Sequence, residues 1–244
     1  MSLEGSAVLV TGGTRGIGLA IAHRLVRDGA SRAVLGYLRN DDAAKSAAAE
    51  LRATGTEVDL VRGNVASEST VDKLAAAGPY RVVVHNAATG VIRPALETED
   101  KHWDWTMNAN ARALLSLACA TAPSMEPGSS IVAVSSLGSQ RVLDNYVLIG
   151  TSKAALESVV RYLGVELAPR GIRVNAVSAG VVDTEALDWF PNKDEMLATA
   201  GRTPAGRLVE PADVAAVVSF LSSGDAAMVC GQTLVVDGGF SLRA

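Results

Sequence analysis

A glycine-rich turn near the start of the chain has the residue types and spacing of a phosphate-binding loop. Residues 11–18 read TGGTRGIG, directly after the apolar run AVLV and directly before an amphipathic helical pattern. Spaced glycines allow a tight turn and a close approach to a pyrophosphate, and the helix N-terminus offers free N–H groups to the phosphates. A purely structural turn is the weaker interpretation in this context. The residues expected to contact a dinucleotide are Gly12, Thr14, Arg15, Ile17 and Gly18.

The end of the second apolar run, RAVLGYL, indicates which dinucleotide binds. Enzymes specific for NAD place a carboxylate there, which accepts a hydrogen bond from the ribose 2′-hydroxyl. This chain instead reads GYLRN over residues 36–40, so Leu38 and Arg39 stand where a carboxylate is expected. Arg39 lies where the 2′-phosphate of NADP would lie, and Arg15 can reach the same place. Solvated surface arginines are the alternative interpretation, but the sequence favours NADPH as the cofactor.

Strands and helices that alternate along the chain must position these residues. Runs rich in β-branched residues, expected to be strands, cover 7–10, 32–38, 57–61, 81–85, 130–135, 172–177 and 233–237. Ala-rich amphipathic stretches, expected to be helices, cover 15–28, 42–53, 67–77, 99–122, 147–168 and 211–223. This alternation is typical of a parallel sheet with helices on both faces, and the strand count is one short of an eight-stranded barrel. We therefore predict an α/β, Rossmann-type doubly wound parallel sheet of seven strands in a single domain, residues 1–244.

One segment does not follow this alternation. Residues 184–206, TEALDWFPNKDEMLATAGRTPAG, lie between the sixth expected strand and the last long expected helix, and they contain two prolines. The mixed pattern and the position predict a lid over the substrate. An ordinary surface insertion is the alternative.

The Gly-x3-Gly-x-Gly spacing resembles that of the short-chain dehydrogenase/reductase family, and the resemblance covers essentially all 244 residues. Further motifs of that family follow in order: Asn64-Val65, Asn86-Ala87-Ala88, Ser135-Ser136, GVVDT at 180–184 and DGG at 237–239. The resemblance implies that Asn64 and Val65 hold the adenine side and that Asn86 and Ala87 flank the adenosine and its ribose. It also implies that Val182 and Thr184 contact the nicotinamide carboxamide.

The catalytic segment departs from the usual pattern of that family, which is a Tyr four residues before a Lys. Lys153 is present, but the residue four before it is Ile149, whose side chain cannot donate a proton. The nearest tyrosine is Tyr146, seven positions before Lys153, so the two share a face if the segment is helical. The phenol is then displaced by about 4.5 Å along the helix axis.

This displacement suits one reaction better than another. In ketone reduction, hydride adds to the carbon whose own oxygen needs the proton donor. In enoyl-thioester reduction, hydride adds to the β-carbon, and negative charge appears on the thioester oxygen two carbons away. Tyr-x6-Lys is the pattern of enoyl-acyl-carrier-protein reductases, and stretches such as SSLGSQRVLDNY resemble those of the FabL type. The resemblance implies an NADPH-dependent enoyl-thioester reductase.

The resemblance also assigns roles to four side chains. Tyr146 hydrogen-bonds the thioester oxygen and stabilises the enolate. Lys153 binds the nicotinamide ribose hydroxyls and holds positive charge near the site. Ser136 lines the pocket beside the nicotinamide. Asn110 either supports the lysine through water or has a structural role.

Several alternatives stay open. A ketoreductase acting on a 3-oxoacyl thioester or another carbonyl is the second reading. A non-catalytic NADP-binding regulator is disfavoured, because Tyr146, Lys153 and Ser136 are all present. The substrate is an acyl thioester carried by coenzyme A or by acyl carrier protein, and a basic rim for the acidic carrier would come from Arg93, Arg202 and Arg207.

The quaternary structure is also predicted by the resemblance. In the family, the C-terminal strand and the helix over 147–168 pack against their counterparts in a symmetric tetramer. Here that helix carries Val159, Leu163 and Leu167, so we expect a homotetramer that uses this face.

Composition limits the remaining classes of function. The net charge of −4 provides no basic field for nucleic acid. No apolar run approaches about 18 residues and no leader pattern opens the chain, which predicts a cytoplasmic protein with no membrane contact. The three histidines have no ligand spacing, so no metal site is expected. Cys119 and Cys230 lie in apolar stretches and are expected to be buried free thiols.

Overall fold

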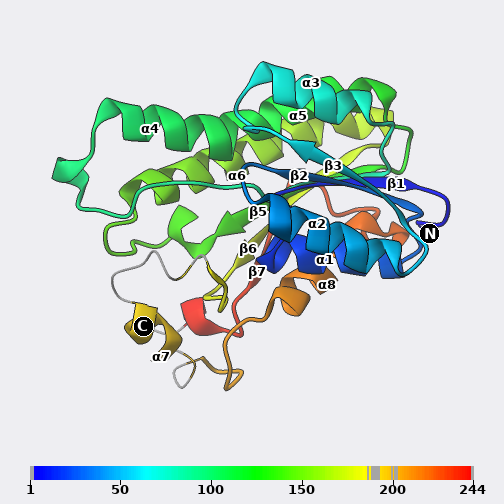
Figure 1. Cartoon of the computed structure of the whole chain (residues 1–244). Coiled ribbons are helices and arrows are strands. Elements are labelled where there is room, and N and C mark those ends of the chain that lie inside the picture. The colour runs from blue at the N-terminus through cyan, green and yellow to red at the C-terminus, as the bar shows by residue number, and fades with distance from the viewer. Residues whose placement is uncertain (1–2, 186, 188–192, 199, 201–202, 243–244) are drawn as a thin grey trace.

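The computed structural model describes residues 3–185, 187, 193–198, 200 and 203–242. Within them, seven parallel strands form one sheet in the order β3-β2-β1-β4-β5-β6-β7 (Figure 1). The strands are β1 (Ala7–Thr11), β2 (Arg32–Tyr37), β3 (Glu57–Arg62), β4 (Val82–His85), β5 (Ser130–Ser136), β6 (Arg173–Ala179) and β7 (Thr233–Val236). The predicted seven-stranded, doubly wound parallel sheet is confirmed, and each strand boundary lies within two residues of its expected position.

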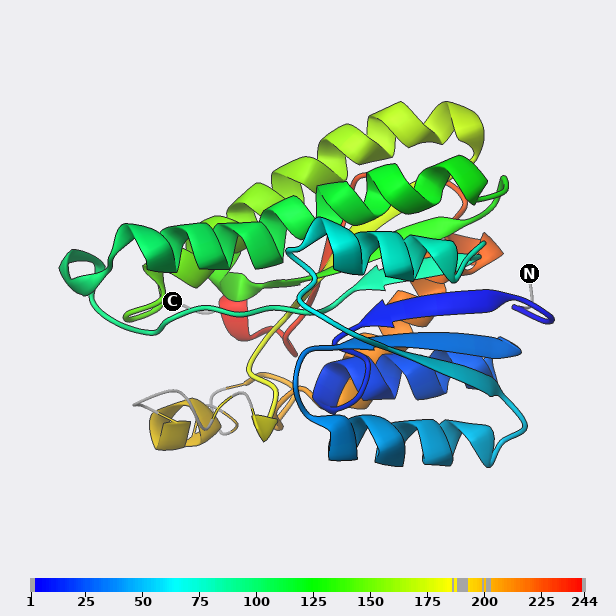
Figure 2. The same cartoon turned by 45° about the horizontal axis from the view of Figure 1, so that its top comes forward.

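Helices cover both faces of the sheet (Figures 1 and 2). One face carries α1 (Gly16–Arg27), α2 (Asp41–Arg52) and α8 (Pro211–Ser222). The other carries α3 (Glu68–Ala76), α4 (Asp100–Met107), α5 (Ala113–Thr121) and α6 (Val147–Leu167). Successive strand residues point to opposite faces, so Val8 and Val10 join the core under α1 while Leu9 joins the core under α5. Both faces are therefore buried, which explains the continuous apolar runs in the sequence.

The single helix expected over 99–122 is interrupted. A π-helical turn, Asn108–Arg112, separates α4 from α5. The wider turn contains Asn110, which is fully buried and hydrogen-bonded to a neighbouring loop and to α6. Such turns are often found at functional sites, and this one places the Asn110 side chain between α6 and the loop after β4.

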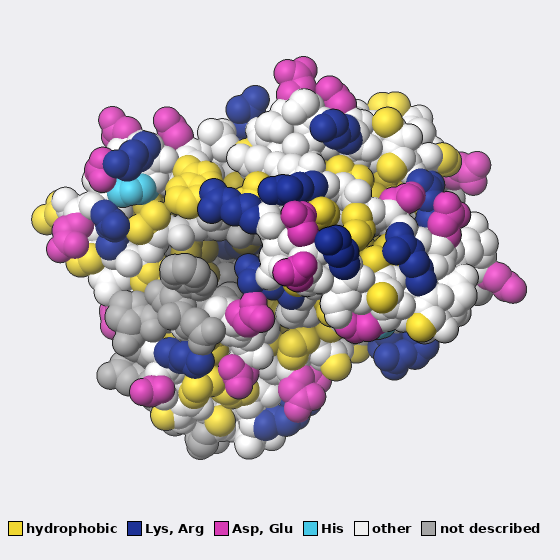
Figure 3. Space-filling view, in the orientation of Figure 1, with side chains coloured by type: hydrophobic (Ala, Val, Ile, Leu, Met, Phe, Trp, Pro, Cys, Tyr) yellow, Lys and Arg dark blue, Asp and Glu magenta, His cyan; other side chains and the backbone are white. Residues whose placement is uncertain are grey.

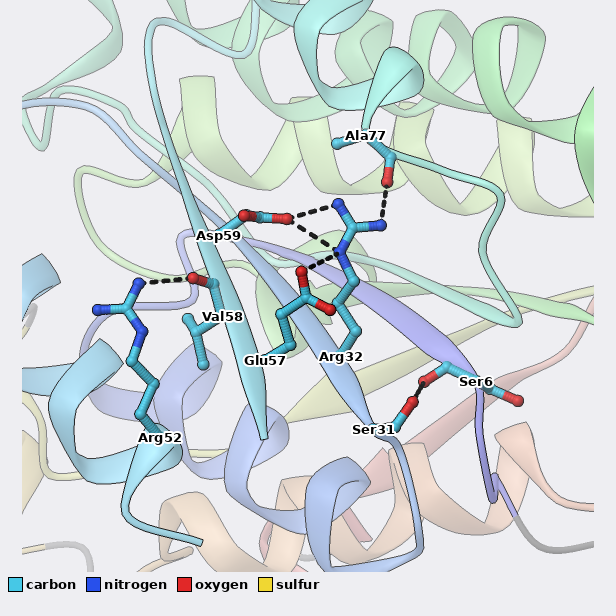
Figure 4. A network of polar contacts seen from close by, with 8 residues as sticks. All are labelled: Ser6, Ser31, Arg32, Arg52, Glu57, Val58, Asp59 and Ala77. Carbon is cyan, nitrogen blue, oxygen red and sulfur yellow. Dashed lines mark hydrogen bonds and ion pairs between the residues drawn. The ribbon is translucent and has the colours of Figure 1, made fainter. Parts of the chain in front are cut away.

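A polar network fastens the edge strand β3 at the amino ends of the strands (Figure 4). Arg32 at the start of β2 donates from Nε to Asp59 Oδ2 at 2.9 Å and from Nη1 to the Ala77 carbonyl at 2.8 Å. Arg52 at the end of α2 donates to the Val58 carbonyl at 2.6 Å. These contacts hold β3 against its neighbours at the amino ends of the strands. The glycine loop lies at the opposite, carboxyl ends.

The surface carries charges of both signs, and Figure 3 shows acidic and basic side chains interspersed over one face. No helix in the part of the chain that the structure describes is long and apolar enough to cross a membrane. Among the same residues, no group of three or more His, Cys, Asp or Glu side chains is placed to hold a metal ion.

The expectation of two buried thiols is wrong for Cys119, which is exposed. Leu114, Leu117 and Ala118 occupy the core-facing side of α5, so the helical repeat turns Cys119 toward the outside. Cys230 is half-buried, and its Sγ donates to the Gly164 carbonyl at 3.2 Å.

Candidate active site

The candidate site lies at the carboxyl ends of the strands, at the point where the strand order reverses its direction across the sheet. β1 lies between β2 and β4, and the chain runs outward from β1 on one side and from β4 on the other. Ligands of open α/β sheets bind at such a switch point. Thr11 and His85 are register partners at the ends of these two strands. Figures 1 and 2 show the short helix α7 (Lys193–Ala198) at the same end of the sheet.

The glycine loop is held in a shape that leaves no room for side chains at two positions. A Cβ on Gly18 would lie 2.0 Å from the Gly12 carbonyl oxygen, and Gly12 has a φ of +63°. Asn86 Nδ2 donates to the Thr11 and Gly12 carbonyls at 3.1 and 3.0 Å. Ala87 N donates to Thr11 Oγ1 at 3.1 Å. The loop after β4 thus fixes the backbone of the loop after β1.

The N-terminus of α1 is open to an anion. Arg15 is its N-cap residue, and no side chain among the described residues caps the helix. The first N–H groups of the helix are then available to a phosphate, together with the positive end of the helix dipole. Thr14 is buried and Ile17 packs against the core, so both hold the loop from the protein side. This cradle fits the pyrophosphate of a dinucleotide.

The end of β2 presents an unpaired cation. Arg39 is exposed, and no hydrogen bond or ion pair joins it to another of the described residues. The nearby carboxylate of Asp41 accepts from Tyr37 Oη at 2.9 Å and from Arg62 Nη1 at 3.2 Å. Each oxygen of the Asp41 carboxylate thus already accepts one hydrogen bond. Leu38 is 47% exposed beside Arg39 and can cover an adenine ring.

The loops after β3 and β6 complete the sides of the cradle. Asn64 Oδ1 accepts from Ala66 N at 3.0 Å, which shapes the loop after β3, and Val65 packs against the core. Val182 is buried and forms a bridge with Val209. A Cβ on Gly16 would lie 3.6 Å from Thr184 Cγ2, so the loop after β6 borders the glycine loop.

Arg15 does not point freely toward the place of a 2′-phosphate. Its Nη1 donates to Glu185 Oε2 at 2.7 Å, and both side chains are exposed. The predicted phosphate contact of Arg15 would require this ion pair to open. Surface pairs of this kind contribute little to stability, so an incoming phosphate can compete for the guanidinium.

Tyr146 lies one residue before α6 and not within it. It is the N-cap residue, and its carbonyl accepts from Gly150 N at 2.7 Å. The ring lies against Gly138, where a Cβ would come within 2.5 Å of Tyr146 Cε1. Its phenol donates to Ser136 Oγ at 3.4 Å. Burial raises the pKa of the phenol, and the bond to Ser136 only partly offsets this, so the phenol is a neutral donor near pH 7.

Ile149 fills the position that a catalytic tyrosine would occupy at the usual spacing. It lies half-buried in the first turn of α6. A Cβ on Gly90 would lie 2.2 Å from Ile149 Cγ1, so the side chain packs directly on the loop after β4. A hydrocarbon therefore stands one helical turn closer to Lys153 than the phenol does.

Lys153 is buried in the second turn of α6. It is 5% exposed, and its Nζ donates to the Val134 carbonyl on β5 at 2.7 Å. Burial lowers the pKa of the amine to about 8, while the carboxylate of Glu157 opposes the shift. The amine is still mainly charged at pH 7, next to the strand end that carries Ser136.

Asn110 connects three segments around the site. Its Nδ2 donates to the Thr89 carbonyl at 2.9 Å and to Ser152 Oγ at 2.8 Å, and its Oδ1 accepts from Thr89 N at 2.9 Å. These bonds fix the loop after β4 against α6, beside Lys153. No direct contact between Asn110 and Lys153 is among these bonds, and both roles, support of the lysine through water and a structural role, stay predictions.

His85 is a site residue that sequence reasoning missed. It is fully buried at the end of β4, with Nε2 3.0 Å from the Asn110 carbonyl and Nδ1 3.3 Å from Thr11 Oγ1. Because a carbonyl only accepts, Nε2 carries the proton and Nδ1 accepts from the threonine hydroxyl. His85 therefore links the glycine loop to the π-helical turn. Its position next to Asn86 was the available signal.

We expect His85 to make the protein less stable in mild acid. Burial lowers the pKa of His85 to about 4, whereas an unfolded histidine titrates near 6.5. Between these values the unfolded chain binds more protons, so the stabilising contribution is present above pH 6.5 and is lost as the pH falls toward 4. The loss between pH 7.5 and pH 5 is about 2 kcal/mol.

Urea denaturation of the wild type and of His85→Gln at both pH values measures this effect. The glutamine variant keeps a donor and an acceptor but does not titrate. The difference in unfolding free energy between the two proteins should shrink by about 2 kcal/mol at pH 5. A difference that stays constant would show that His85 is not the group responsible.

Parts of the predicted lid and of the predicted basic rim lie outside the residues that the structure describes. Of the segment 184–206, residues 186, 188–192, 199 and 201–202 lie outside the described residues, and Arg202 is among these. Arg207 binds both carboxylate oxygens of Asp213, at 2.6 and 2.8 Å. It is therefore less available to an acidic carrier than the sequence suggested. The lid stays a prediction.

Comparison with known proteins gives the family. A family model described as Enoyl-(Acyl carrier protein) reductase matches residues 12–241. A 1-cyclohexenylcarbonyl-CoA reductase from Streptomyces collinus is 37% identical over 244 residues, which is 97% of this chain and 87% of that protein.

Solved structures of similar length agree with this. A blue fluorescent protein from a metagenomic library, in complex with NADPH, is 32% identical with a TM-score of 0.89, covering 99% of this chain and 100% of that chain. A short chain dehydrogenase from Burkholderia cenocepacia, in complex with NADP, is 31% identical with a TM-score of 0.90 and the same coverage. The chain belongs to the short-chain dehydrogenase/reductase superfamily.

Proposed function

We propose that this protein is an NADPH-dependent enoyl-thioester reductase. The observation that carries the proposal is the arrangement at the start of α6, where Ile149 stands at the usual tyrosine position and Tyr146 lies upstream against Ser136. A phenol displaced in this way is suited to an oxygen two carbons from the carbon that receives hydride. The Streptomyces collinus relative is named a 1-cyclohexenylcarbonyl-CoA reductase, and this name supports an unsaturated acyl thioester as the substrate.

The bound dinucleotide supplies the hydride, and the chain's own residues handle the charge that results. Addition to the β-carbon places an electron pair on the thioester oxygen as an enolate. The neutral phenol of Tyr146 turns its single proton from Ser136 to that oxygen, and the Ser136 hydroxyl then donates to the phenol oxygen instead of accepting from it. Protonation of the α-carbon, with a proton that comes ultimately from solvent, then gives the saturated thioester. Lys153 binds the ribose hydroxyls and holds positive charge nearby.

NADPH is the cofactor that the cradle supports best. The exposed guanidinium of Arg39, which has no partner among the residues that the structure describes, favours a 2′-phosphate over a 2′-hydroxyl. Lys and Arg side chains also lie along the edge of the hollow in the middle of the face in Figure 3. The two solved relatives bind NADPH and NADP.

Replacing Arg39 by Ala should weaken NADPH binding by about 1.5–3 kcal/mol, or roughly 10- to 150-fold in Kd, and leave NADH binding nearly unchanged. Only NADPH carries a charged phosphate on the 2′ oxygen of the adenosine ribose, where Arg39 is expected to lie. Fluorescence titration of both cofactors measures the effect, and Arg27→Ala, exposed in the last turn of α1, is the matched control. Equal losses for the two cofactors would place the 2′-phosphate elsewhere.

A homotetramer remains part of the proposal, on a corrected surface. Leu163 lies in the chain's own core, and Val159 and Leu167 pack against that core, so they do not form an outward face. The exposed apolar residues of α6 and the C-terminal region include Tyr162, Val165, Met228 and Val235. We infer that these residues are the ones that meet a second copy.

Oxidation of NADPH with a panel of thioesters tests the function. We expect crotonyl-thioesters to be reduced with a much higher kcat/KM than acetoacetyl-thioesters. Each acyl group is offered on coenzyme A and on acyl carrier protein, so the same panel identifies the carrier. Preference for the acetoacetyl group would make the protein a ketoreductase. No oxidation with any thioester would favour a binding role.

A further inference from the structure

A buried carboxylate lies one helical turn beyond Lys153 and takes no direct part in the chemistry above. Glu157, in the middle of α6, is 4% exposed. Its Oε1 accepts from Ser135 Oγ and from Ser139 Oγ, both at 2.6 Å, and its Oε2 accepts from Gln140 Nε2 at 3.4 Å. Burying an ionised carboxylate is costly unless such bonds compensate for the lost water. All three donors belong to one segment, residues 135–140.

That segment contacts the side chain of Tyr146, which carries the proposed catalytic phenol. It contains Ser136, whose Oγ accepts from the Tyr146 phenol at 3.4 Å, and Gly138, on which the ring lies. A Cβ on Gly150 would lie 2.6 Å from the Gly138 carbonyl oxygen, so the segment also packs closely on α6. A shift of the segment would therefore move the phenol and its partner together.

The same carboxylate acts on Lys153. The amine donates to the Val134 carbonyl, next to Ser135 on β5, so Lys153 and Glu157 hold two consecutive residues at the end of that strand. The titratable groups that interact with the amine are Glu157 on the same helix and His85 on β4. Burial lowers the pKa of His85 to about 4, so it is neutral near pH 7 and the negative charge comes from Glu157.

We propose that Glu157 is a positioning residue for the active site. It holds the segment 135–140 on α6, so that the Tyr146 phenol stays at its working place, and its negative charge favours the protonated amine of Lys153. Glu157 can act on both groups because positions 153 and 157 are one turn apart and share one face of α6. The catalytic consequence rests on the proposed function, whereas the effect on Lys153 does not.

Three variants separate the parts of this role. Glu157→Gln keeps the shape and loses the charge. Ser139→Ala removes one donor and keeps the charge. Glu166→Gln makes the same change at an exposed position of the same helix and is the matched control. Circular dichroism and thermal unfolding verify that each variant is folded.

The first measurement is kinetic and uses whichever thioester the wild type reduces. We expect Glu157→Gln to lower kcat about 10- to 100-fold with little change in the KM for NADPH, because the phenol is misplaced while the glycine loop is intact. Ser139→Ala should lower kcat by a smaller factor. Glu166→Gln should leave both constants unchanged.

The second measurement needs no substrate. Titration of Lys153 by NMR in protein with labelled lysines reports its pKa, and a Lys153 variant assigns the signal among the five lysines of the sequence. Removing the negative charge should move the pKa of Lys153 below its value of about 8, while Ser139→Ala should leave it in place. A merely structural role would not separate these two variants.

The outcomes are distinct. A folded Glu157→Gln variant with the kcat and the Lys153 titration of the wild type would overturn the positioning role. If Glu157→Gln does not fold, the double variant Ser139→Ala, Gln140→Ala still tests the contacts, and an unchanged kcat in it would overturn the role. A wild type that reduces only 3-oxoacyl thioesters would contradict the proposed function but leave the Glu157 comparison intact.

Discussion

Replacing Tyr146 by Phe should lower kcat for enoyl-thioester reduction by about 10²–10³, the usual loss when one oxyanion donor is removed. The ring that lies against Gly138 is retained, so the segment around Ser136 should keep its place. Only the hydroxyl that meets the developing charge disappears. NADPH affinity should barely change, because Lys153 and the glycine loop are untouched. Steady-state kinetics and a fluorescence titration of NADPH measure the two effects.

The matched control for this change is Tyr162→Phe, which removes the hydroxyl of a 70% exposed tyrosine on the same helix and keeps the ring that is inferred to meet a second copy. It should leave both kcat and NADPH binding as in the wild type. An unchanged enoyl rate in Tyr146→Phe would mean that another group stabilises the enolate. Ser136, 3.4 Å from the phenol, would then be the next candidate.

Moving the phenol to the usual position should not restore enoyl reduction. In the double variant Tyr146→Phe, Ile149→Tyr, the phenol returns to the position four residues before Lys153, within the first turn of α6. It would then lie beside the carbon that receives hydride instead of the thioester oxygen. We expect the enoyl rate to stay about 10²–10³ below the wild type and slow acetoacetyl-thioester reduction to appear.

The control for this prediction is Tyr146→Phe, Ile149→Phe, which adds the same ring without a hydroxyl. Position 149 packs on Gly90, so both double variants place similar bulk against the loop after β4. The control should reduce neither thioester well. Recovery of enoyl reduction in the tyrosine variant would mean that the position of the phenol does not select the substrate.

The framework could be predicted from the sequence because its signals are local. Apolar β-branched runs marked all seven strands, and the glycine loop marked the first strand, turn and helix. Sequence spacing was insufficient to place Tyr146 relative to Lys153. Seven positions suggested two helical turns between Tyr146 and Lys153, but Tyr146 is the N-cap residue and its place is set by Gly138 and Ser136.

The polar network behind the site could not be predicted in the same way. His85 is held by Thr11 and by the Asn110 carbonyl, and Glu157 by side chains from 17 to 22 positions earlier. Such partners meet only when distant strands and helices pack together. The outward turn of Cys119 and the inward place of Leu163 likewise depend on which side of a helix meets the sheet.

The fate of the transferred hydrogen tests the central claim most directly. The enzyme is given equal amounts of crotonyl- and acetoacetyl-coenzyme A, together with NADPH that carries deuterium at the transferred C4 position. We expect mass spectrometry and NMR to find butyryl thioester with deuterium on C3, the β-carbon, and a solvent-derived hydrogen on C2. Deuterium found instead in 3-hydroxybutyryl thioester, on the carbon that bears the hydroxyl, would contradict enoyl reduction and identify the enzyme as a ketoreductase.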